Sequence, residues 1–112
     1  MIIHFSKTKH KRLINDFNAL SKKIDRKGLN NAVEIIDTIR ALEAADSLHD
    51  VPHFYRPHPL RGKFKGYFAV DVTDTHRVIF KPDHDGDSNF RIDTYKTITL
   101  IIIIEIFIDY HE

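Results

Sequence analysis

The chain has 112 residues, 42% of them hydrophobic and 29% charged, which fits one globular domain over residues 1–112. Cysteine is absent, so a disulfide framework and thiol chemistry are excluded. The formal net charge is only +1, so the chain as a whole lacks the strong positive charge that is typical of many nucleic-acid-binding domains.

The apolar runs are too short for a membrane helix. The longest covers residues 100–104 and ends at Glu105, whereas a membrane-spanning helix needs about 20 apolar residues. The first residues also lack the basic segment and long apolar stretch of a secretion signal. We therefore expect a soluble, cytoplasmic protein that does not associate with a membrane.

A short strand and a long helix are predicted first. Residues 2–5 are mostly apolar and indicate a strand. Apolar side chains then recur at helical spacing, which predicts one amphipathic helix over residues 7–26. Ser6 is the expected N-cap of this helix, and Gly28 fits its end.

A second helix and a long loop follow. Residues 31–45 carry apolar side chains on one helical face, and Asn31 with Glu34 has the spacing of a capping box. Residues 49–65 contain three of the four prolines. Because proline removes a backbone donor and disfavours helix in the preceding residue, this stretch is predicted to be a loop.

The rest of the chain predicts three antiparallel strands. Residues 67–72 and 76–81 alternate between apolar and polar side chains, and residues 82–89 form an acidic surface loop. The isoleucine-rich residues 97–109 are predicted to be a central strand covered on both faces. The predicted fold class is α+β, with two N-terminal helices on one face of a small, mostly antiparallel, curved sheet. Its opposite, concave face is then open to host a site.

Charge is distributed unevenly along the chain. Residues 53–68 contain four basic side chains and no acidic one, namely Arg56, Arg61, Lys63 and Lys65. Residues 31–50 are mostly acidic. Charge segregated in this way can build a positive face on a nearly neutral protein, and Lys63 and Lys65 are predicted to contact RNA phosphates.

Three groups of residues carry side chains suited to cleaving RNA. They are His58-Pro59-Leu60-Arg61-Gly62, His76-Arg77-Val78-Ile79-Phe80 and the final Asp109-Tyr110-His111-Glu112. Cleavage through the 2′-hydroxyl needs a base, an acid for the leaving 5′-oxygen, and positive donors for the charge on phosphorus. Histidine suits both proton transfers, because its ordinary pKa is about 6.5, and arginine gives a forked set of donors to phosphate.

The same three groups, in this order, resemble HigB-type toxins (plasmid maintenance killer proteins) of the RelE/ParE superfamily. Those toxins share a His-Pro-Leu-Lys/Arg-Gly loop, a strand with an Arg-hydrophobic-hydrophobic-Phe pattern and a closing Asp-Tyr-His. The resemblance covers residues 49–112 and departs from the family at Arg61, where lysine is more common. It implies a RelE/ParE-like fold and a catalytic set consisting of His58, Arg61, Arg77, Asp109, Tyr110 and His111.

The resemblance also implies a function and a partner. The chain would be the toxin of a type II toxin–antitoxin system, a ribosome-dependent mRNA endoribonuclease (mRNA interferase) that inhibits translation by cutting mRNA in the ribosomal A site. It would need no metal ion or other cofactor. Its partner would be a HigA-type helix-turn-helix antitoxin, and it would meet operator DNA only through that antitoxin.

Two other functions use the same fold. A ParE-like inhibitor of DNA gyrase is one, although such chains usually lack a histidine-bearing terminus like that at His111. A non-catalytic module that docks a partner on the concave face is the other. Under either alternative, His58 is a solvated loop histidine and Arg77 an ordinary surface cation.

Neither of two other polar clusters predicts a metal site. Asp83, His84, Asp85 and Asp87 do not match the spacing of a calcium-binding loop. His49, His53 and His58 lack the helical spacing or cysteine partners of a zinc site.

Overall fold

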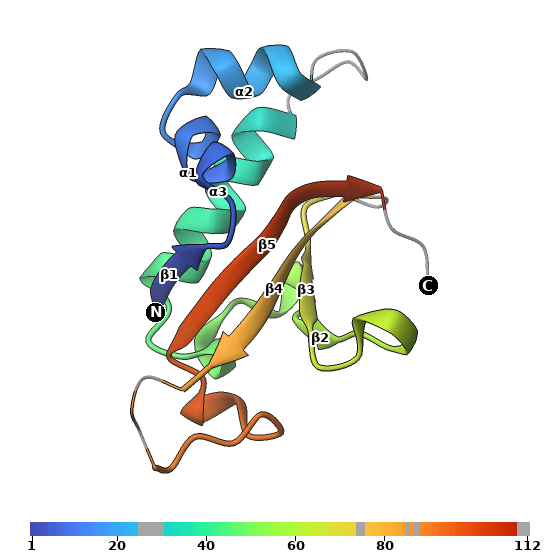
Figure 1. Cartoon of the computed structure of the whole chain (residues 1–112). Coiled ribbons are helices and arrows are strands. Elements are labelled where there is room, and N and C mark those ends of the chain that lie inside the picture. The colour runs from blue at the N-terminus through green and yellow to red at the C-terminus, as the bar shows by residue number, and fades with distance from the viewer. Residues whose placement is uncertain (25–30, 74–75, 85, 87, 110–112) are drawn as a thin grey trace.

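The computed structural model describes residues 1–24, 31–73, 76–84, 86 and 88–109 (Figure 1). It contains three helices and one five-stranded sheet, in the order β1 (Ile2–Phe5), α1 (Thr8–Ile14), α2 (Phe17–Ile24), α3 (Asn31–Ala44), β2 (His58–Pro59), β3 (Phe68–Asp71), β4 (His76–Asp83) and β5 (Leu100–Asp109). The predicted α+β class is therefore confirmed. No helix in this part of the chain is long and apolar enough to cross a membrane.

The prediction of one helix over residues 7–26 is wrong, because α1 and α2 are separate. The Asn15 amide donates to the Lys11 carbonyl at 2.9 Å, and an Asp16 carboxylate oxygen accepts from the Ala19 backbone N–H at 3.1 Å. Asp16 thus caps the start of α2, and such local bonds compete with a continuous helix. The predicted Ser6 cap is also wrong, since Lys7 precedes α1 and makes no side-chain cap. Gly28 lies outside the described residues.

The strands lie in the order β1-β5-β4-β3-β2. The three predicted antiparallel strands are confirmed as β3, β4 and β5, while β1 pairs with β5 in parallel. The middle strand is β4, with β5 between it and β1. Two expected loops contain strand residues: β2 pairs with β3 at the sheet edge, and Pro82 pairs with Ile101. Pro59 lies in β2, the edge strand, and Pro82 lies in β4 beyond its pairing with β3. A sheet tolerates proline at such positions, where the strand has a neighbour on one side only.

The helix-covered face of the sheet carries the main core. Strand side chains on this face pack against buried residues of α2 and α3, and the strand residues are Phe68, Val70, Val78, Phe80, Ile101, Ile103 and Ile106. Phe68 and Phe80 are cross-strand partners with ring centroids 6.0 Å apart. Figure 1 shows α1, α2 and α3 grouped on one side of the sheet.

The opposite face, called the open face below, has only a small apolar cluster. Leu60, Ala69 and Ile79 are buried there, and Phe64, Tyr67 and Ile104 pack against them. Coverage of the predicted central strand is therefore unequal: Ile101 and Ile103 are buried, whereas Ile102 and Ile104 are half-buried. The expectation that this strand is covered on both faces therefore holds on the helix side and only in part on the open face.

Candidate functional site

Polar side chains gather on the open face where β3 ends and β4 begins. Asp71 of β3 is the cross-strand partner of Arg77 of β4, and Ala69 is the partner of Ile79. Directly opposed residues share a face, and so do residues two apart along a strand. Asp71 and Arg77 therefore lie on the same face as the small apolar cluster and away from the helices.

One carboxylate holds two arginines at this position. Nε of Arg77 lies 3.0 Å from Oδ1 of Asp71, and Nε of Arg56 donates to Oδ2 at 2.8 Å. The Arg77 side chain is only 16% exposed, against 57% for Arg56. Solvent therefore screens the charge of Arg77 less than that of Arg56. A phosphate beside Arg77 would be attracted more strongly than a phosphate beside an exposed cation.

Arg56 has an unusual backbone. It ends the 3-10 turn His53–Tyr55 in the left-handed region, with φ 50° and ψ 59°. That conformation costs a non-glycine residue roughly 1–2 kcal/mol, so it persists only where the surroundings impose it. With this backbone the carbonyl oxygen of Arg56 lies 2.7 Å from Nδ1 of His58.

His58 is thereby oriented on the open face. It is half-buried in β2 and is the cross-strand partner of Ala69, which places it on the same face as Arg77. A carbonyl oxygen can only accept, so Nδ1 of His58 carries the hydrogen. In the neutral ring Nε2 then has a lone pair and can take up a proton.

The loop after β2 carries the other predicted cations. Arg61, Lys63 and Lys65 are all exposed, and Gly62 turns the chain with φ +64°. Nζ of Lys63 lies 5.5 Å from the centre of the Phe64 ring, which packs on the small apolar cluster. In Figure 1 this loop projects from the side of the sheet opposite the helices.

The end of β5 comes to the same region. Asp109 pairs with His76, and Ile108 pairs with Arg77. The end of β5 therefore lies beside the start of β4, as Figure 1 shows. The side chain of Asp109, together with Tyr110 and His111, lies outside the described residues, so the predicted roles of these three residues stay predictions.

The sequence prediction missed Arg56 and Asp71 as site residues. In the sequence Arg56 stands out only as part of the basic stretch, and Asp71 is only a polar residue of an alternating strand. The signal for Asp71 is its place two residues after Ala69, on the same face of β3. Its pairing with Arg77 depends on the strand register, and no single-sequence pattern states that register.

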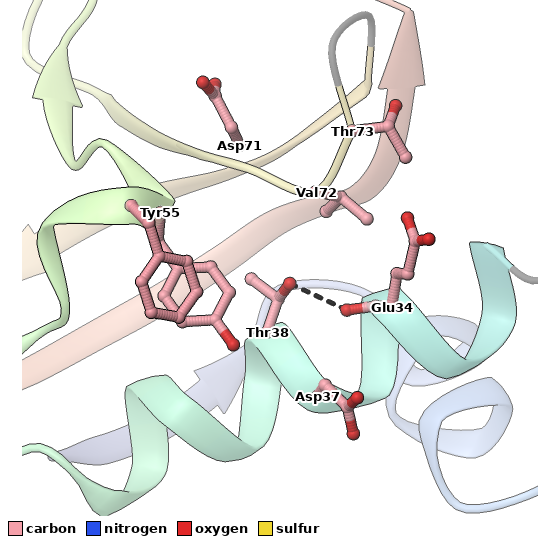
Figure 2. A pocket seen from close by; sticks show the side chains of 8 residues that line it. Glu34, Asp37, Thr38, Tyr55, Asp71, Val72 and Thr73 are labelled. Atoms are coloured by element: carbon pink, nitrogen blue, oxygen red, sulfur yellow. Dashed lines mark hydrogen bonds between the residues drawn. The ribbon is translucent and has the colours of Figure 1, made fainter.

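A hollow of about 340 Å³ opens on the helix side of the sheet, between α3 and the end of β3. Its lining is acidic and aromatic and consists of Glu34, Asp37, Thr38, Phe54, Tyr55, Asp71, Val72 and Thr73. Burial, together with the charge of Asp37, raises the pKa of Tyr55. Figure 2 shows the Asp71 carboxylate pointing away from α3. Because carboxylates repel phosphate, this hollow does not suit RNA.

Comparison with known proteins identifies the fold. No family model matches the chain. A 30-residue segment is 43% identical to the toxin YoeB of Streptomyces coelicolor, over 27% of this chain and 36% of that relative, so the chain spans about a third of it.

Two solved structures align over nearly the whole chain. The YoeB/ParE toxin from Agrobacterium tumefaciens has a TM-score of 0.56 at 16% identity and aligns over 99% of this chain and 100% of its own. The YoeB–YefM complex from Staphylococcus aureus gives a TM-score of 0.52 at 17% identity, over 100% and 98%. The chain therefore has the YoeB/ParE toxin fold, which confirms the expected RelE/ParE-like fold.

Proposed function

We propose that the chain is the toxin of a type II toxin–antitoxin pair and acts as a ribosome-dependent mRNA endoribonuclease. The observation that carries the proposal is the arrangement of His58 and Arg77 on one open face, each held by a defined partner. The YoeB/ParE fold supports it. The HigB-like motifs belong to the same superfamily, and the HigB branch is the finer part of the proposal.

In the proposed reaction, His58 is the general base. Its Nε2 removes the proton from a 2′-hydroxyl, and the resulting oxygen attacks the adjacent phosphorus. Arg77, joined by Arg61 from the loop, stabilises the negative charge that develops on the phosphate oxygens. The bond to the 5′-oxygen then breaks, and His111 donates a proton to that oxygen. The products are a 2′,3′-cyclic phosphate and a 5′-hydroxyl.

Asp109 and Tyr110 complete the proposed site. Asp109 orients the imidazole of His111, and Tyr110 stacks on a base or donates a hydrogen bond. Asp109 is the last residue of β5 and pairs with His76, the residue next to Arg77.

The ribosome supplies the RNA in this proposal. The chain has a net charge of only +1, which gives a limited grip on free RNA, whereas the A site presents the message already held. Lys63 and Lys65 contact the phosphates of that message.

The proposed protein partner is an antitoxin, and the resemblance of the motifs implies one of the HigA type. Contact with operator DNA is made by that antitoxin.

The test is to induce the gene in a bacterial host and map mRNA 5′ ends for the wild type, His58→Ala and His111→Ala. We expect new ends within translated codons for the wild type and few for either variant. DNA breaks without mRNA cleavage would favour the gyrase inhibitor. A doubly substituted protein that arrests growth like the wild type would favour the non-catalytic docking module.

A further inference from the structure

We propose that Asp71 is a positioning residue that couples Arg77 to His58 through Arg56. The inference rests on the proposed function for its effect on RNA cleavage. The coupling itself is a property of the protein without RNA. It connects three elements that are separate in the sequence: the loop segment around Arg56, the end of β3 and the start of β4.

The first step is the division of one carboxylate between two guanidinium groups. Oδ2 of Asp71 accepts from Arg56 at 2.8 Å, and Oδ1 lies 3.0 Å from Nε of Arg77. Both arginines are contacted at Nε, so this one carboxylate orients the plane of each guanidinium group. The carboxylate of Asp71 thus joins two positive side chains that come from separate parts of the chain.

The second step runs from the Arg56 side chain to its backbone. Arg56 is in the left-handed region, its N–H donates to the His53 carbonyl at 2.9 Å and its side chain is tied to Asp71. These two anchors fix the residue at both ends. Its carbonyl oxygen is then directed at Nδ1 of His58, 2.7 Å away.

The third step is the consequence for His58. A hydrogen bond to a carbonyl selects the tautomer with hydrogen on Nδ1, whereas a solvated neutral histidine prefers hydrogen on Nε2. Removing the Asp71 carboxylate loosens Arg56 and with it the carbonyl that selects this tautomer. The same change removes the carboxylate that lies 3.0 Å from Nε of Arg77. One substitution on β3 therefore disturbs both the base and the phosphate contact.

The spectroscopic test uses the whole protein without RNA. Nitrogen-15 NMR of His58 at a pH where the ring is neutral is expected to show hydrogen on Nδ1 in the wild type. In Asp71→Asn, which keeps the side-chain shape, we expect a mixture with the Nε2–H form. The matched control is Asp37→Asn, which changes an exposed carboxylate of the neighbouring hollow on α3. An unchanged His58 tautomer in Asp71→Asn would overturn the coupling.

The kinetic test uses single-turnover cleavage of mRNA on stalled ribosomes. A small displacement of catalytic groups can cost about 100-fold in rate, so we expect a loss of that order in Asp71→Asn with little change in ribosome affinity. We expect Asp71→Glu to recover part of the rate, because it restores the carboxylate. A merely structural role would lower stability and affinity without this split.

A double substitution tests the route through Arg56. If Asp71 acts on His58 through Arg56, adding Arg56→Gln to Asp71→Asn costs little more rate than the single change. Fully additive losses would overturn the route. Should Asp71→Asn fail to fold, Arg56→Gln alone is predicted to alter the His58 tautomer. If the wild type cleaves no RNA but the tautomer responds, the proposed function fails and the coupling stands.

Discussion

The two faces of the sheet are built from the same strands but differ in what their side chains do. On β3, Phe68 and Val70 enter the helix-covered core, while Ala69 and Asp71 face the other way. The helix-covered face is continuous and apolar, whereas the open face has a small apolar cluster bordered by charged groups. Strand alternation thus allows the side chains for stability and those for chemistry to change independently.

The largest expected effect is the loss of stability when the core of the helix-covered face is reduced. Phe80 is fully buried on the helix-covered face, so Phe80→Ala is predicted to lower the free energy of unfolding by about 3–5 kcal/mol. Phe54 is 77% exposed, and Phe54→Ala should change it by less than about 0.5 kcal/mol. Urea denaturation measures the free energy of unfolding of both variants. Similar losses in the two variants would contradict the placement of the main core on the helix-covered face.

The next effect belongs to the open face. Arg77→Gln removes the charge that we place at the phosphate, and the cleavage rate on ribosomes should fall by about 10²–10³-fold. Circular dichroism should still report a folded protein, because Asp71 keeps its contact with Arg56. Arg40→Gln, an exposed helix position, is the control and should cleave at the wild-type rate. Retained activity in Arg77→Gln would show that the reacting phosphate does not bind at Arg77 on the open face.

A smaller effect concerns the loop after β2. If Lys63 and Lys65 each contact a phosphate, replacing both by alanine should flatten the plot of log affinity against log salt by roughly 1.4, at about 0.7 per contact on single-stranded RNA. Binding of an RNA oligonucleotide at several salt concentrations measures this slope. Lys81→Ala, exposed on β4, should leave the slope unchanged. An equal change there would mean that the attraction is diffuse.

The smallest effect is a pH dependence of stability at the junction of α1 and β5. His10 is buried there, with Nε2 3.7 Å from Oε2 of Glu105. Burial lowers its pKa below 6.5, and the Glu105 carboxylate opposes this shift only in part. The unfolded chain therefore binds a proton that the folded chain resists, and stability should fall as pH drops below about 6.5.

Unfolding free energies at pH 7 and pH 5 measure this dependence, and His10→Leu is the comparison. The difference between the two pH values should be smaller in His10→Leu than in the wild type. If both proteins lose the same stability on acidification, His10 is not the group responsible.

Sequence patterns predicted the parts of the fold that depend on periodicity. Alternation identified β3 and β4, and isoleucine richness identified β5. The break between α1 and α2 was missed because it depends on the side-chain hydrogen bonds of Asn15 and Asp16, which a helical apolar spacing conceals. The short strand β2 was missed because its prolines suggested only a loop.

The candidate site was predicted only in part, because some of its residues stand in sequence motifs and others do not. His58 and Arg77 stand in recognisable motifs, and the register of β2, β3 and β4 brings them to one face. Arg56 and Asp71 stand in no motif. Their role depends on a left-handed backbone and on a cross-strand pair, and both are tertiary features.

The parallel pairing of β1 with β5 has a consequence for how the molecule is made. Ile2 pairs with Leu100, so nearly the whole chain separates these neighbours. While the nascent polypeptide is emerging, β1 has no ladder to join until β5 has been synthesised, and β4 has an open edge until the same moment. Such non-local closure is slow compared with local folding, so the open face is assembled only after residues 100–109 have docked.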